Sequence, residues 1–241
     1  MAAGKESFGE SRHGIEWAMS TLPEIRFDGG RSFAGDTEIR LEPLPSSTGT
    51  DDYSIRFEGL SARVMSNTAT GAISGILSLG EMLRTGKRAA VENRPRFKTR
   101  NYKHELRLDP QDPRSILKYT DATWESLFQN VVAHRFNGIV FYARYHPFEY
   151  ILDYKDFPNA ADRPEEERAA ARKAFNRGLE IAHRYGLTTF MQHYVGHYTM
   201  GMARSCGIPM RGRFSATEHP RIEEYCRYCY REIFAQAPAL D

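Results

Sequence analysis

The chain has 241 residues, of which 41% are hydrophobic and 27% charged, a composition typical of a globular protein with one large domain or two smaller ones. Its formal net charge of +2 gives no reason to expect a nucleic acid or a membrane surface as partner, and no apolar run approaches the ~18 residues of a membrane helix. The first residues contain no apolar stretch of a signal peptide, so we expect a cytoplasmic location by default, unless a leader has been trimmed.

The first 90 residues predict a small α+β domain. Ile55 and Phe57 alternate with Arg56, as they would in a half-buried strand. Apolar residues recur at helical spacing over 70–85, and Gly86 ends that helix. The β-like runs lie at 24–28, 37–44, 52–57 and 60–65.

From residue 97 onward, the pattern is a strand followed by a helix, three times over. Residues 87–96 read as a linker into this part. Its clearest helix has apolar residues at i, i+3, i+4, i+7 and i+8, from Trp124 to Val132. The continuous apolar run 139–142 suits a strand buried on both faces of a parallel sheet. The expected strands are 98–106, 139–142 and 187–192, and the expected helices are 121–134, 162–185 and 217–236.

Alternating strands and helices of this length indicate a (β/α) barrel or an open doubly wound sheet. The chain stops where a fourth unit would begin, and three units cannot close a barrel. We therefore expect domain 1–90 to be followed by domain 91–241, which would hold the first three βα units of an incomplete (β/α)8 TIM barrel. The whole would be the N-terminal portion of a longer enzyme, or a truncated copy of one.

Three short segments are the candidate site, because ligands of parallel α/β folds lie at the C-terminal ends of the strands. The segments are 104–107, 143–146 and 192–198, and they are rich in aromatic, histidine, arginine and carboxylate groups. Such a mixture suits a sugar, whose apolar face packs on flat rings while charged groups bind its hydroxyls. The alternative is that these tyrosines and histidines are amphipathic surface residues.

Two patterns resemble metal or redox motifs without meeting their requirements. His193 and His197 are four residues apart, but the stretch contains glycine and follows a strand, whereas zinc needs three or four ligands in defined geometry. Cys226 and Cys229 form a C-x-x-C inside a predicted helix, on its apolar face, where core packing is the expected role. We expect no metal and no cofactor.

The stretch 94–101, Arg-Pro-Arg-Phe-Lys-Thr-Arg-Asn, resembles the start of the catalytic barrel in glycoside hydrolase family 20, the β-N-acetylhexosaminidases. The preceding segment 68–83 resembles the end of the α/β domain that comes before that barrel, and similar two-domain starts occur in α-glucuronidases. The resemblance implies a carbohydrate substrate and hydrolysis of a glycosidic bond. In that family the acetamido group of the substrate itself acts as nucleophile.

The resemblance also implies roles for particular residues. Arg100 matches an arginine that binds sugar hydroxyls, Glu105 falls at an aspartate, and His197 falls at the histidine of a Pro-Gly-His motif. Asn101 departs from the family glycine, and the catalytic Asp-Glu pair that follows strand four is absent, so no catalytic residue is expected in this span. The remaining expected sugar-binding residues are Arg144, Tyr145, His146 and His193.

Two alternatives remain open at this point. One is an α-glucuronidase-like hydrolase, in which Arg100 or Arg144 would pair with a uronate carboxylate. The other is a non-catalytic carbohydrate-binding or structural fragment. For Arg100 itself, the alternative role is a structural pair with a neighbouring carboxylate.

Overall fold

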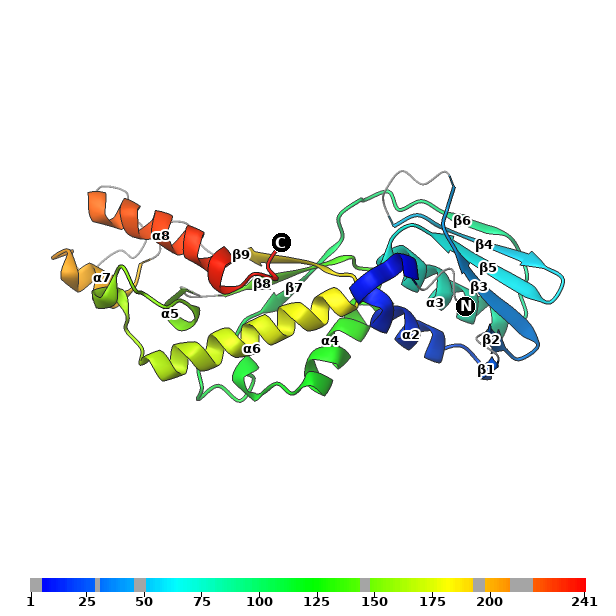
Figure 1. The fold of residues 1–241 in the computed structure, drawn as a ribbon, viewed down its shortest axis with the longest axis horizontal. Helices are drawn as coiled ribbons and strands as arrows, with labels where there is room; N and C mark the ends of the chain where they lie inside the picture. The colour runs from blue at the N-terminus through cyan, green and yellow to red at the C-terminus, as the bar shows by residue number, and fades with distance from the viewer. Residues whose placement is uncertain (1–5, 29–30, 46–50, 144–147, 193–197, 209–218) are drawn as a thin grey trace. The chain divides into compact units, whose positions relative to one another are not determined.

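The computed structural model describes residues 6–28, 31–45, 51–143, 148–192, 198–208 and 219–241 (Figure 1). The chain divides into two units that interleave along the sequence. The first unit comprises Met1–Tyr102, Glu125–Ile139 and Ile181–Thr188, and the second comprises Lys103–Trp124, Val140–Glu180 and Thr189–Asp241. The expected division into domains 1–90 and 91–241 stays a prediction.

A six-stranded mixed sheet dominates the first unit (Figure 1). Only β3 and β5 pair in parallel, and the other neighbours are antiparallel. In spatial order the strands are β1 (Ile25–Asp28), β2 (Arg31–Ala34), β3 (Thr37–Glu42), β5 (Ser61–Ser66), β4 (Tyr53–Glu58) and β6 (Val91–Asn93).

Helix α3 (Ala69–Arg84) packs on this sheet and confirms the helix expected over 70–85. It begins where the Thr68 side chain accepts a hydrogen bond from the Gly71 amide. Gly75 permits a close approach, since a Cβ there would lie 2.6 Å from a methyl of Val64. The side chains buried between helix and sheet include Ile55, Val64, Ile73, Ile76 and Leu79.

A second helix, α2 (Arg12–Ser20), packs on α3 and was not expected from the sequence. It follows a short 3-10 helix, η1 (Glu6–Ser11). Ile15, Ala18, Met19 and Leu22 are buried at helical spacing, so the periodic signal was present in a short segment.

A separate sheet has the order β7 (Asn101–Glu105), β8 (Gly138–Tyr142) and β9 (Thr188–Gln192). The Asn137 amide bonds to the Arg100 carbonyl at one end of β7 and β8, and the Leu106 amide bonds to the Tyr142 carbonyl at the other. These two strands therefore run in parallel. Helix α4 (Asp121–Ala133), helix α6 (Glu165–Arg184) and helix α8 (Pro220–Gln236) follow β7, β8 and β9 along the chain, as expected.

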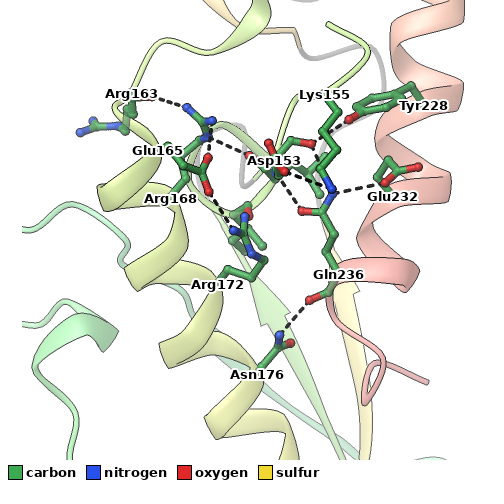
Figure 2. A network of polar contacts seen from close by, with 12 residues as sticks. Asp153, Lys155, Arg163, Glu165, Arg168, Arg172, Asn176, Tyr228, Glu232 and Gln236 are labelled. Carbon is green, nitrogen blue, oxygen red and sulfur yellow. Dashed lines mark hydrogen bonds and ion pairs between the residues drawn. The ribbon is translucent and has the colours of Figure 1, made fainter. Parts of the chain in front are cut away.

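The second unit also contains the short helices η2 (Ile116–Lys118), α5 (Phe148–Ile151), η3 (Pro158–Ala160) and α7 (Met200–Ser205). Figure 2 shows a polar network that holds the segment after α5 against α6 and α8. Arg168 and Arg172 of α6 donate to the carbonyls of Leu152 and Ile151, at 2.8 and 2.7 Å. Gln236 of α8 accepts the Asp153 amide at 2.8 Å. Backbone groups outside regular structure are thus satisfied by long side chains.

One expectation for the fold was wrong. Residues 87–96 were expected to form a linker, but they contain strand β6, which pairs with β4. Three residues, two of them polar, give no alternation from which a strand could be recognised.

No helix in the part of the chain that the structure describes is long and apolar enough to cross a membrane.

Candidate functional site

The candidate site lies on one face of the β7–β8–β9 sheet, within the second unit. Side chains alternate across a strand, so Lys103 and Glu105 share one face of β7 while His104 takes the other. His104 packs against Trp124 of α4 and Phe141 of β8, with ring centroids 6.4 and 6.3 Å apart. The helices therefore cover the His104 face, and we call the opposite side of the C-terminal strand ends the polar face.

Lys103 and Tyr142 meet on this polar face. The Lys103 ammonium lies 3.8 Å from the centroid of the Tyr142 ring, a cation–π distance. Lys103 is exposed, and it makes no ion pair with any residue that the structure describes. The polar face therefore presents a tyrosine ring with a charged donor above it.

Arg107 forms the second cluster, just after β7. Its guanidinium pairs with Glu105 at 2.6 Å and with Asp112 at 2.9 Å. The pKa of the Asp112 carboxyl lies below its usual value, because the Arg114 amide and then the Arg107 guanidinium donate hydrogen bonds to it. The same two carboxylates raise the pKa of Arg107. Asp112 is therefore held by donors that favour its ionised form, which suits it to accept hydrogen bonds rather than to donate a proton.

His104 belongs to the packing beneath the site. Burial lowers the pKa of its imidazole, so the neutral form is favoured. Its Nε2 has no hydrogen-bond partner among the residues described, and Tyr119, Trp124 and Phe141 surround the ring. It sets the position of the strand that carries Lys103 and Glu105.

Arg100 precedes β7, at the opposite end of the strand from Glu105, and lies in the first unit. Its guanidinium donates to the carbonyls of Arg135 and Phe97, at 2.7 and 2.8 Å, and to a carboxylate oxygen of Asp51 at 2.7 Å. The other Asp51 oxygen accepts the hydroxyls of Thr68 and Thr70. This geometry corresponds to the alternative of a structural pair with a neighbouring carboxylate, and its proposed contact with sugar stays a prediction.

The structure describes one further expected sugar-binding residue, Glu105. The other five lie outside the described residues, namely Arg144, Tyr145, His146, His193 and His197. Glu105 is the one that lies on the polar face. Among the described residues, no group of three His, Cys, Asp or Glu side chains could hold a metal ion.

Sequence reasoning did not single out Lys103, Tyr142 or the Arg107–Asp112 pair as binding residues. The signal for Lys103 was its spacing, since it is two positions from Glu105 on a predicted strand and so shares its face. The pairing of Arg107 with Asp112 depends on the path of the loop after β7, which residue types alone do not reveal.

Solved structures of glycoside hydrolases share this fold. A GH138 enzyme targeting pectin rhamnogalacturonan II matches with a TM-score of 0.73 and 18% identity over 95% of this chain and 28% of its own. The GH20 β-N-acetylhexosaminidase of Streptomyces coelicolor A3(2) gives a TM-score of 0.60 at 11% identity, covering 95% of this chain and 52% of that one. The chitobiase of Flavobacterium johnsoniae gives a TM-score of 0.60 at 13% identity, and the match covers 98% of this chain and 38% of the chitobiase.

The likeness is one of fold, at identities too low to show a shared activity. The chain spans about a quarter to a half of the length of these structures. No family model matches the sequence, and no curated protein matches it. What the structure and the comparisons establish together is a mixed α/β chain with a glycoside-hydrolase-like fold.

Proposed function

We propose that this chain is the N-terminal portion of a glycoside hydrolase, and that its polar face binds and orients a sugar. The observation that carries the proposal is the polar face itself: a tyrosine ring with an ammonium above it, beside a carboxylate, at the C-terminal ends of parallel strands. Ligands of parallel α/β folds lie at that edge. The likeness to glycoside hydrolases over 95% of the chain supports the same assignment.

As part of this proposal, residues 91–241 form the first three βα units of a (β/α)8 barrel. The proton donor of the reaction would come from residues outside this span. Glu105 and Asp112 do not suit that task, because Arg107 pairs with both carboxylates, and the hydrogen bonds that Asp112 accepts lower its pKa. A general acid of a glycosidase instead needs a raised pKa.

The first candidate substrate is a glycan that contains N-acetylhexosamine, as the family 20 resemblance of stretch 94–101 implies. The second candidate is a pectic glycan, and it is favoured by the larger TM-score of the GH138 enzyme, 0.73 against 0.60. An α-glucuronidase-like hydrolase and a non-catalytic carbohydrate-binding protein remain the other readings of the same face.

Titration calorimetry with two probes tests the proposal, one being N-acetylglucosamine and the other a rhamnogalacturonan II fragment. We expect at least one to bind, and Lys103→Ala to weaken that binding about tenfold, the loss of one charge-assisted hydrogen bond. Lys155→Ala is the matched control, since Lys155 is 80% exposed and lies outside the polar face. The absence of binding by both probes, or binding that Lys103→Ala leaves unchanged, would contradict the proposal.

A further inference from the structure

The outer face of the six-stranded sheet, away from α3, contains a pocket in the first unit. Its volume is about 230 Å³, below the roughly 300–1,000 Å³ of clefts that take drug-sized ligands. It therefore has room for one small ring. The residues around it come from β4, β5 and β6 and from the segments after β3, before β4 and after β6. They are Leu44, Pro45, Asp52, Tyr53, Ser54, Arg56, Met65, Glu92, Asn93 and Arg94.

Ser54 is the unusual residue of this pocket. It is 3% exposed, and its hydroxyl has no hydrogen-bond partner in the part of the chain that the structure describes. Leaving a buried hydroxyl unpaired costs free energy, so such a group calls for an explanation. Met65 pairs with Ser54 across β4 and β5 and is itself buried, which gives the hydroxyl an apolar neighbour.

The chemistry of the lining favours a neutral ligand with many hydroxyls. Two positive charges, Arg56 and Arg94, are balanced by two negative ones, Asp52 and Glu92, so the pocket does not select a strong anion or cation. Guanidinium and amide groups donate while carboxylates accept, and a sugar hydroxyl does both. Leucine, proline and methionine supply apolar surface for the face of a ring.

The rim also has an unused donor. Arg56 pairs with Glu92 at 3.7 Å, and both side chains are mostly exposed. Arg94 is exposed and has no ion-pair partner among the described residues. Its planar group can donate two parallel hydrogen bonds to neighbouring hydroxyls.

We propose that this pocket binds a single neutral sugar ring, with the Ser54 hydroxyl bonding it from below and Arg94 from the rim. The site is separate from the polar face of β7 and β8, and it would let the chain hold a glycan at a second point. The argument uses the lining of the pocket and does not depend on the proposed hydrolase function.

The test is an amide NMR titration of the full chain with three probes, glucose, N-acetylglucosamine and rhamnose. At least one should give saturable shifts at the pocket amides, with a millimolar dissociation constant. Ser54→Ala and Arg94→Ala should each weaken that binding at least fivefold. Ser61→Ala is the matched control, because its hydroxyl lies on the same face but donates to Glu38 at 3.2 Å.

A thermal melt separates binding from folding. Ser54→Ala removes an unpaired hydroxyl, so without sugar it should melt at the same temperature as wild type or higher. A lower melting temperature would mean that the hydroxyl is structural and would overturn the proposal. So would the absence of saturable shifts with all three sugars, or shifts that persist in Ser54→Ala. Lys103→Ala should leave the pocket signals intact, so failure here and failure at the polar face are distinguishable.

Discussion

Arg100 ties together three acceptors of the first unit, and replacing it with lysine tests that role. The planar guanidinium reaches the Arg135 carbonyl, the Phe97 carbonyl and the Asp51 carboxylate at once. A lysine ammonium places its donors on one atom and cannot reproduce this spread. At about 0.5–1.5 kcal/mol for each net hydrogen bond, losing two of the three should lower the free energy of unfolding by about 1–3 kcal/mol.

Urea unfolding followed by circular dichroism measures this change. Arg100→Ala should cost more, about 3–5 kcal/mol, because it leaves the buried Asp51 carboxylate without its cation. Arg96→Lys is the control, since Arg96 is exposed and should change stability by less than about 0.5 kcal/mol. If Arg100→Lys unfolds like wild type, the structural role is refuted. A variant that keeps its stability and loses sugar binding would support the role that the family resemblance implies.

Four further predictions follow from the described contacts. Gly178→Ala should lower the free energy of unfolding by about 1–3 kcal/mol in a urea titration, because the added Cβ would lie 2.8 Å from the Trp124 ring. A gain in stability, which is the usual effect of this substitution in a helix, would contradict the packing. Because the pKa of His104 is lowered in the folded state, the unfolded chain binds a proton at this residue first, and stability should fall as the pH drops below about 6.5. In His104→Phe, the difference in melting temperature between pH 7 and pH 5 should be smaller than in wild type. Burial raises the pKa of the Cys229 thiol, so it should react with a thiol reagent at pH 8 only after unfolding; rapid native labelling would refute its burial. The purified chain should not hydrolyse aryl N-acetylglucosaminides, since its described polar-face carboxylates are paired with Arg107, and reproducible turnover would contradict this.

The main elements could be predicted from the sequence because their signals are long and periodic. Helix α4 begins at Asp121 as expected, and the run at 139–142 is the buried strand β8. Two short strands were not predicted, since β2 and β6 offer four and three residues and draw their stability from neighbouring strands.

The candidate site was predictable in place and only partly in detail. The rule that parallel sheets bind at the C-terminal strand ends selected the segment 104–107, which contains Glu105 at the end of β7. It did not reveal that Arg107 folds back on Glu105 and Asp112, or that Arg100 is engaged at the other end of the strand. Those pairings depend on the three-dimensional path of the chain, so motif matching assigned Arg100 to sugar while the structure surrounds it with internal acceptors.

A crystal structure of the chain soaked with N-acetylglucosamine or a rhamnogalacturonan II fragment tests the central claim most directly. The account predicts a sugar ring on the polar face, against the Tyr142 ring and within hydrogen-bond distance of Lys103 or Glu105. A polar face that stays empty with both ligands at saturating concentration, or a sugar bound only in the Ser54 pocket, would contradict it.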